Sequence, residues 1–182
     1  MTIMKKLVFA TMMCIASMSA NAQVLTSETV KHVYEEASLK ADSKFAFNAD
    51  FTGQDITTMY VYRMNGGGRD MLTLKPHVKY DYTYAADGKL TSKVTYRWDD
   101  SMNSWKSTAR HDYTLADGQY SIEYSRYNST AKCFDQPVDK MVYSMMPYDN
   151  YVSSYHRNDS SLEYQLISEL QVIDAPNLLA EK

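Results

Sequence analysis

The chain is poor in the residues that build disulfide frameworks and redox centres. Its 182 residues include two cysteines, Cys14 and Cys133. Because Cys14 lies in an N-terminal run that we expect to be removed, the remaining thiol has no partner for an internal disulfide. The fold must therefore be stabilised by its apolar core, and we interpret Cys133 as a half-buried small hydrophobic residue before Phe134. An intermolecular disulfide through Cys133 is the alternative.

Metal-binding and phosphate-binding patterns are also missing. The four histidines are His32, His77, His111 and His156. None belongs to a His-x-x-x-His motif or to a Cys/His cluster, so the sequence predicts no metal site, and we expect each on a strand surface or in a turn. The multi-glycine stretch at 66–68 has no following Lys-Ser and predicts a hairpin loop. We therefore expect no cofactor.

The N-terminal residues have the three parts of a secretory signal peptide. Lys5 and Lys6 precede an apolar run at 7–16, and the small-residue triplet Ala20-Asn21-Ala22 follows. The run is shorter than the roughly 20 residues that a membrane-spanning helix needs. We predict that residues 1–22 are removed and that the protein is exported to the periplasm or the cell exterior. A buried N-terminal helix is the alternative.

Residues 23–182 have the length of a single domain with its own core. Loss of Lys5 and Lys6 would change the formal charge from −3 to −5. The basic residues of this part are scattered, so we expect no nucleic-acid partner. No second apolar run approaches membrane length, so we expect no transmembrane segment in the mature chain.

What the sequence does contain is a turn pattern that recurs about every 30 residues. A short sequence motif occurs four times, and its copies end at Asn65, Asp99, Asn128 and Asn158. A large apolar or aromatic residue follows six positions after each, at Met71, Trp105, Phe134 and Tyr164. Asp and Asn side chains accept hydrogen bonds from the backbone two residues on, which starts a turn. We interpret each unit as a strand, a turn and a return strand.

A tighter turn alternates with the first. Asp87-Gly88, Asp117-Gly118 and Asp149-Asn150 suit the positive φ that tight hairpin turns require. The segments between turns alternate with a period of two, as in 89–98, and the chain has 16 tyrosines, which favour strands. The spacing between the two turns differs by one residue between copies, so we expect a β-bulge or a changed loop.

One segment near the N-terminus favours a helix. Thr26-Ser27 can cap a helix from Glu28 to about Ala41, because Val30, Val33, Tyr34, Ala37 and Ala41 then share one face. The sequence as a whole predicts a mainly β fold: an antiparallel β-meander of repeated hairpins with about eight to ten strands, one N-terminal helix and a twisted or curled sheet.

Several of these segments together resemble a known group of proteins. They are Tyr-Asp-Tyr-Thr-Tyr at 80–84, Asp-Gly at 87–88, Tyr-Arg-Trp-Asp at 96–99, Trp105 and Val-Tyr at 142–143. In this combination the chain resembles a family of uncharacterised secreted proteins from gut Bacteroidota, a domain of unknown function, over residues 45–181. The Tyr and Asp-Gly hairpins are more distantly similar to the tyrosine-aspartate repeats of large surface and toxin shells, by analogy only because the period differs. Neither resemblance implies a catalytic residue, a ligand or a cofactor.

The aromatic residues near the longer turns are the candidate binding site. They are Tyr62, Tyr96, Trp98, Trp105, Tyr127 and Tyr155. These rings could gather at one edge of the sheet, where exposed aromatic rows stack on sugar rings or anchor a protein interface. Packing of the rings on the faces of the sheet, or pairing with Lys and Arg as sheet stabilisation, are the structural alternatives.

We therefore expect a non-enzymatic binding or interaction module for a glycan or protein. A structural component that assembles through its sheet edges is the first alternative. A carbohydrate-active enzyme is the second, because two carboxylates facing one cleft suffice for glycoside hydrolysis. Asp99, Glu123 and Glu163 are the acids considered for that role, although Asp99 is explained by its turn and the glutamates by solvent exposure.

Overall fold

The computed structural model describes residues 24–40, 44–66, 73–145, 150–158 and 163–172. The described residues form one helix, α2 (Ser27–Leu39), and a ten-stranded antiparallel sheet. The predicted signal peptide at 1–22 and the C-terminal tail at 174–182 lie outside the described residues.

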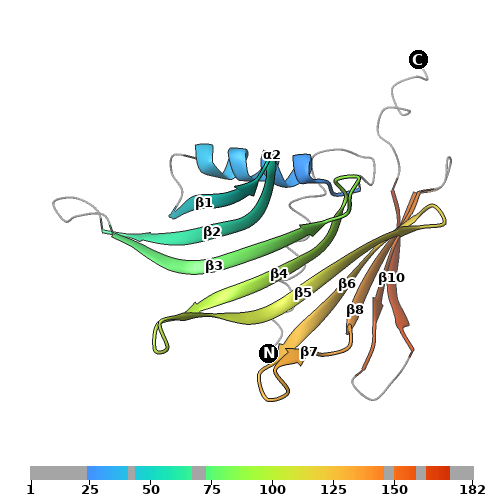
Figure 1. Ribbon diagram of the computed structural model, residues 1–182. Helices are drawn as coiled ribbons and strands as arrows, with labels where there is room; N and C mark the ends of the chain where they lie inside the picture. Colours follow the sequence, from blue (N-terminus) through green and yellow to red (C-terminus); the bar gives the residue numbers. More distant parts are fainter. Residues whose placement is uncertain (1–23, 41–43, 67–72, 146–149, 159–162, 173–182) are drawn as a thin grey trace.

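The strands follow one another along the sheet in chain order. Their bounds are β1 (Phe45–Thr52), β2 (Asp55–Asn65), β3 (Thr73–Tyr84), β4 (Leu90–Asp99), β5 (Ser104–Ala116), β6 (Gln119–Asn128), β7 (Cys133–Phe134), β8 (Asp139–Met145), β9 (Asn150–His156) and β10 (Gln165–Val172). The two-residue β7 pairs only with β6, which also pairs with β8. The order confirms the predicted antiparallel meander, and the sheet is open, with β1 and β10 at its two edges (Figure 1).

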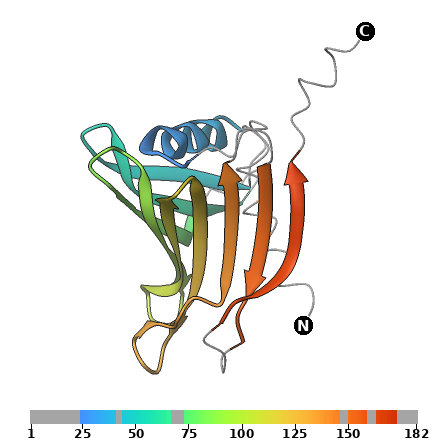
Figure 2. The same ribbon diagram turned by 90° about the vertical axis from the view of Figure 1, so that its right-hand side faces the viewer.

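The sheet is strongly twisted. From the side, β6, β8, β9 and β10 stand next to one another, while β1 and β2 run crosswise behind them and below α2 (Figure 2). Register shifts interrupt the ladders, for example at Thr83/Tyr84, where β4 carries an extra residue, Thr91. Such bulges increase the local twist and absorb the one-residue difference between repeats. The expectation of a bulge in this repeat is confirmed.

Both predicted turn types are present. Asp99 Oδ1 accepts hydrogen bonds from the backbone N–H groups of Ser101 (2.9 Å) and Met102 (3.1 Å). Asn128 Oδ1 does the same with Thr130 (3.1 Å) and Ala131 (3.0 Å). The tight turns use positive φ, as at Gly88 (78°) and Gly118 (70°). Repeated turn chemistry therefore sets the length of successive hairpins.

The helix forms where capping and the apolar face predict it. Thr26 is the N-cap, and its side chain and that of Thr29 complete a capping box. Val30 is buried, and Tyr34 packs against the core cluster. The segment before the helix is tied to the sheet, because the Leu90 N–H donates to the Leu25 carbonyl (2.9 Å). The helix therefore covers one face of the sheet, which we call the core face.

Side chains on the core face make the hydrophobic core. The buried members of the cluster are Val30, Ile56, Met59, Leu90, Tyr113, Tyr120 and Ile122. Tyr113 and Ile122 are cross-strand partners, and residues paired in this way point to the same face of a sheet. Tyr84 also lies against the cluster and donates from its hydroxyl to the Ile56 carbonyl (2.8 Å). We call the opposite face, which α2 does not cover, the open face.

Two histidines differ from the expectation that every histidine lies on a strand surface or in a turn: His32 lies in α2, and His111 is part-buried in the sheet. His111 is on the core face, opposite Lys93 in the pairing of β4 with β5, and its buried Nδ1 has no hydrogen-bond partner among the residues that the structure describes. Burial and the charge of Lys93 lower the pKa of His111 to about 3. Burial likewise lowers the pKa of Lys93 to about 8. The expectation failed because strand alternation places position 111 on the same face as Tyr113.

Candidate functional site

The register places all six predicted aromatic residues on the open face. Tyr62 alternates with the buried Val61, and Tyr96 pairs with Lys79, which itself pairs with Tyr60. Trp98 and Trp105 are direct cross-strand partners. Tyr127 and Tyr155 belong to the same face through the ladders of β6, β8 and β9. The open face is therefore rich in aromatic side chains, and these side chains are not covered by α2.

Four of these six residues come together with Tyr60. We call Tyr60, Tyr62, Tyr96, Trp98 and Trp105 the aromatic cluster. The Trp98 and Trp105 rings meet edge to face, with centroids 5.1 Å apart. The Trp105 ring also lies 6.3 Å from Tyr60, which is 6.4 Å from Tyr62. All five side chains are partly exposed, so the cluster is packed and still accessible.

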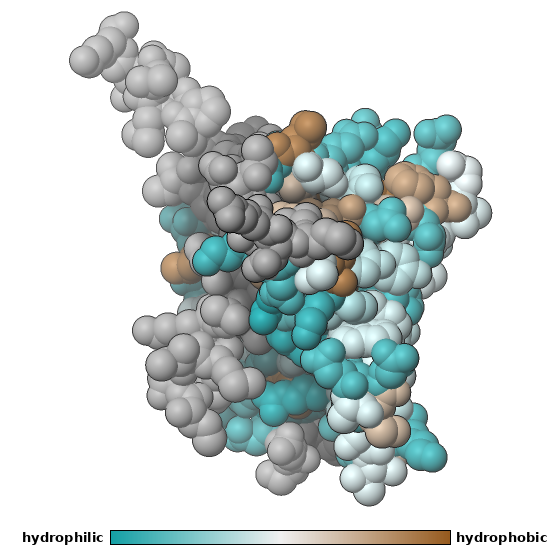
Figure 3. All heavy atoms as spheres, turned by 90° about the vertical axis from the view of Figure 1, so that its left-hand side faces the viewer, coloured by the Kyte–Doolittle hydropathy of each residue, from teal (hydrophilic) through white to brown (hydrophobic). Residues whose placement is uncertain are grey.

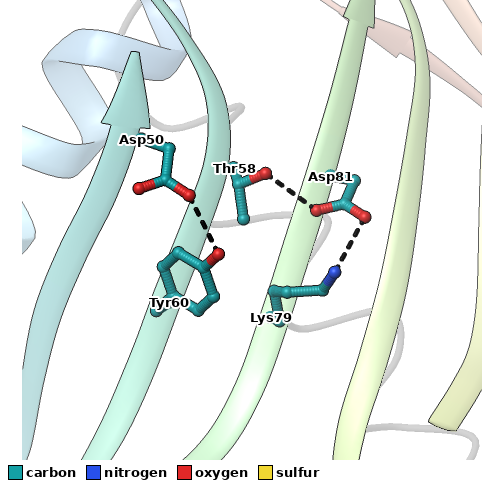
Figure 4. A network of polar contacts seen from close by, with 5 residues as sticks. All are labelled: Asp50, Thr58, Tyr60, Lys79 and Asp81. Atoms are coloured by element: carbon teal, nitrogen blue, oxygen red, sulfur yellow. Dashed lines mark hydrogen bonds and ion pairs between the residues drawn. The ribbon is translucent and has the colours of Figure 1, made fainter. Parts of the chain in front are cut away.

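A polar network holds the orientation of this cluster. The Tyr60 hydroxyl donates to Asp50 Oδ2 at 2.9 Å, and this bond is the main reason that the pKa of Tyr60 is raised. Thr58 Oγ1 and Lys79 Nζ both donate to Asp81, each at 3.0 Å. Figure 4 shows these side chains projecting from β1, β2 and β3 on the same side of the sheet.

Lys79 connects the network to the cluster. Its ammonium group lies 4.0 Å from the centre of the Tyr96 ring, a cation–π contact. Hydrogen-bonded neighbours that fix a ring before a ligand arrives reduce the entropy lost on binding. Sequence reasoning missed Tyr60, Lys79 and the two aspartates, although the alternation of Tyr60 with Tyr62 in β2 was a visible signal.

Tyr127 lies apart from the cluster. Its ring meets Phe134 of β7 edge to face at 5.2 Å, and the Arg110 guanidinium lies 5.0 Å from the Phe134 ring. These contacts attach the two-residue β7 to β6 and resemble the sheet-stabilising alternative. Tyr127 is therefore a suitable comparison residue for the cluster.

Tyr155 lines a groove on the β6 to β10 half of the open face. The groove has a volume of about 460 Å³, within the range of small-molecule sites. We call it the tyrosine groove; it is lined by Tyr151, Tyr155 and Tyr164 together with Lys140, Ser153 and Glu169, among others. Ser153 donates to Glu169 at 2.9 Å, and Lys140 lies 3.4 Å from Glu123. Burial and Glu123 raise the pKa of Tyr164 to about 12.

The acids considered for glycoside hydrolysis have other partners. Asp99 forms an ion pair with Lys106 at the β4–β5 turn, and the bonds from Lys106 and Ser101 hold the pKa of Asp99 well below its usual range. A general acid needs a raised pKa, so Asp99 does not suit that role. Glu123 pairs with Lys140 on the edge of the tyrosine groove.

The described residues were also considered as a metal site and as a membrane span. In the residues described by the structure, no three His, Cys, Asp or Glu side chains are grouped as a metal site would require. The helix in the same residues is too short and too polar to cross a membrane. Cys133 is exposed in the two-residue strand β7, so the interpretation of Cys133 as a half-buried residue is wrong.

Comparison with known proteins gives a family and a fold. A family of unknown function, DUF3836, matches residues 33–145. No protein with a curated description matches the chain. The fold is similar to that of a protein with unknown function from Bacteroides fragilis, known from a crystal structure. The two have a TM-score of 0.61 and 24% sequence identity, and the match covers 71% of this chain and 93% of that chain.

Two further solved structures are DUF3836 proteins. The one from Parabacteroides distasonis has a TM-score of 0.47 and 22% identity, and covers 54% of this chain and 87% of that one. The one from Bacteroides vulgatus has a TM-score of 0.46 and 22% identity, with coverage of 50% and 89%. The likeness to the Bacteroides fragilis protein concerns the fold alone.

Proposed function

The chain belongs to DUF3836, a family of unknown function, and we propose that it is an exported, non-enzymatic binding protein that holds a glycan on its open face. The aromatic cluster is the observation that carries this proposal. Five partly exposed rings lie within one region of a sheet face that α2 does not cover. The C–H faces of a sugar ring pack well on such rings, because they are apolar and flat.

The polar groups beside the cluster favour a sugar over a purely apolar ligand. Asp50 and Asp81 each place a carboxylate next to the rings, and Thr58 and Lys79 contribute donors. Carboxylates accept more than one hydrogen bond, so sugar hydroxyl groups can add to the existing bonds. A protein that buries the same rings is the competing partner, and the test below separates the two.

The proposed export depends on the N-terminal residues. Lys5 and Lys6, the apolar run and Ala20-Asn21-Ala22 are the supporting features. Expression in a bacterial host with export machinery, followed by intact-mass measurement, tests this part. We expect a mature chain that begins at Gln23; a full-length cytoplasmic product would contradict export.

Glycan-array screening of the mature protein, followed by calorimetric titration of the strongest hit, tests the binding. Trp98→Ala and Trp105→Ala should each weaken binding about tenfold or more, because each removes a stacking surface. Tyr127→Ala is the matched control and should leave affinity unchanged, since Tyr127 packs on Phe134 outside the cluster. If no glycan on the array binds and a protein binds to the same rings, the partner of the aromatic cluster is a protein and the glycan proposal is wrong.

A second candidate function rests on the edge strand β10. Leu166, Ile167 and Leu170 are 55%, 64% and 64% exposed, and no described strand pairs with the outer side of β10. Open edges with exposed apolar residues pair readily with other strands. If the protein is an assembly component, light scattering should show association that Ile167→Lys reduces. Leu39→Lys is the control, because Leu39 is 82% exposed on α2, away from the edge. A wild-type monomer at all concentrations would exclude this candidate.

A further inference from the structure

A notch opens where two hairpins separate beside the aromatic cluster. The ladder between β3 and β4 ends at Val78 and Arg97. The β2–β3 ladder continues to Asn65 and Thr73, and the β4–β5 ladder continues to Asp99 and Ser104. Figure 1 shows these two hairpins diverging. A cavity of about 210 Å³ lies between them, and we call it the notch.

Two of the residues that line the notch are cationic and lie opposite each other in the sheet. Arg63 and Lys75 are direct cross-strand partners, and both line the cavity. Strand alternation places both residues on the core-face side, opposite to Tyr62 and Trp98, so the notch runs between the two faces where the hairpins separate. On that side of the sheet, the next cross-strand pair is Arg97 with Lys106. Like charges directly opposite one another destabilise a sheet. Within the described residues only Lys106 of these four forms an ion pair, with Asp99.

The pKa of a neighbouring histidine is lowered by burial and by the positive charge of the notch. His77 lines the notch and stacks on Phe45, with ring centroids 5.5 Å apart. Burial lowers the pKa of His77, and the charges of Arg63 and Arg97 lower it further. Asp100 is the carboxylate that also lines the cavity, so Arg63 and Lys75 outnumber it. The notch is therefore a local positive site on a chain whose formal net charge is −3.

The wall of the notch is shared with the aromatic cluster. Trp98 lines the cavity and contacts Trp105. In Figure 3, the coloured part of the surface that faces left in Figure 1 is mostly hydrophilic or intermediate, with small hydrophobic patches. A volume of about 210 Å³ is below the roughly 300–1,000 Å³ of sites that enclose a whole small ligand. The notch can therefore hold one substituent, while the rest of a ligand lies over the rings.

We propose that the notch binds the oxyanion of an acidic sugar, a sulfate or carboxylate group, while the sugar ring stacks on the Trp98 side of the aromatic cluster. This inference rests on the proposed glycan-binding function and names the ligand class. The planar guanidinium of Arg63 can donate two parallel hydrogen bonds to such a group, and Lys75 adds a point charge. Binding of the anion also removes the repulsion between the two cations.

Calorimetric titration with three probes tests the proposal: N-acetylglucosamine 6-sulfate, N-acetylglucosamine and inorganic sulfate. We expect the sulfated sugar to bind at least about tenfold more tightly than the neutral sugar, and to weaken as salt concentration rises. The double variant R63Q/K75Q should lower the affinity for the sulfated sugar to that for the neutral one. Lys140→Gln, in the tyrosine groove, is the control and should change neither affinity.

Thermal unfolding of the same variants gives a second readout. Without ligand, R63Q/K75Q should unfold at the same or a higher temperature than the wild type, because it removes a repulsive pair. Weaker binding with unchanged or raised stability cannot come from loss of fold. A lower melting temperature would show that the two cations stabilise the sheet, which contradicts our interpretation of them.

The outcomes separate the two proposals. Equal binding of sulfated and neutral sugars that depends on Trp98 would overturn the acidic-sugar inference and leave the proposed function standing. Binding of inorganic sulfate alone, with neither sugar bound more tightly, would reduce the notch to a simple anion site and overturn the inference. If none of the three probes binds but the array identifies a different glycan, anion binding in the notch is contradicted. Glycan binding by the aromatic cluster would then still stand.

Discussion

The two faces of the sheet use the same residue type for different purposes. On the core face, Tyr113 and Tyr120 are 8% and 3% exposed and stack on each other. Burial raises the pKa of both well above that of free tyrosine. On the open face, Tyr60 and Tyr62 are partly exposed and lie beside two tryptophans. The difference arises from α2 and the segment before it, which cover one face only.

This comparison shows that aromatic content alone does not define a binding surface. Alternation along a strand divides the rings between two faces, and the covering layer decides which face becomes core. The core face should therefore control stability, and the open face should control binding. The predictions below test this division, beginning with the largest expected effect.

Truncation of a fully buried core-face side chain should have the largest effect. Ile56 is 0% exposed, and Ile56→Ala should lower the free energy of unfolding by about 4 kcal/mol, since it leaves a cavity in a packed core. Urea denaturation followed by far-ultraviolet circular dichroism measures the change.

A matched valine pair sharpens this test. Val61 is buried on the core face and Val94 is partly exposed on the open face, so the same change to alanine probes both. We expect a loss of about 2 kcal/mol for Val61→Ala and under about 1 kcal/mol for Val94→Ala. Equal losses would show that the open face is packed as a second core.

Acid should destabilise the protein through the buried His111. Its pKa is lowered to about 3 in the folded state from the ordinary 6.5 of histidine, so the unfolded chain binds more protons between these values. The stabilising contribution is fully present above pH 6.5 and is lost as the pH falls, by about 3 kcal/mol at pH 4. Urea denaturation at a series of pH values measures the slope.

Two variants identify the source of this acid effect. His111→Phe removes the titrating group and should flatten the slope between pH 6.5 and 4. His32→Gln, on the exposed surface of α2, should leave it unchanged. A slope that persists in His111→Phe would assign the effect to other groups and contradict the buried position of His111.

Loss of a single core-face hydroxyl should have the smallest effect. Tyr84→Phe removes the hydrogen bond to the Ile56 carbonyl and should cost about 1 kcal/mol, because a part-buried acceptor loses its donor. Tyr62→Phe on the open face should cost less than about 0.5 kcal/mol. Differential scanning calorimetry of both variants measures the difference, and reversal of their order would contradict the assignment of faces.

Local chemistry made much of the fold predictable. Asp99, Asn128 and the Asp-Gly pairs each start a turn through interactions within a few residues, so their spacing predicts the hairpins. Thr26 and the apolar face of α2 are equally local signals. One copy of the repeat is one residue longer, which predicted a bulge or a changed loop; the structure has the bulge, at Thr91.

The composition of the site was less predictable, because it depends on twist and on where ladders end. Tyr60 and Trp105 come from β2 and β5, which are separated by two strands, and still lie 6.3 Å apart. The notch exists because the β3–β4 ladder ends before its neighbours. Neither feature follows from spacing along the chain. The burial of His111 likewise depends on which face the helix covers.

Tryptophan fluorescence tests the central claim most directly, because both tryptophans of the chain, Trp98 and Trp105, belong to the aromatic cluster. If the open face is a binding surface, iodide should quench the emission of the native protein, and a bound glycan should protect it. After each quencher is normalised to its effect on free tryptophan, iodide should quench relatively more than cesium, since Arg63 and Lys75 line the same notch as Trp98. Emission that resists both quenchers and does not respond to any glycan would show that the rings are structural, and would contradict the account.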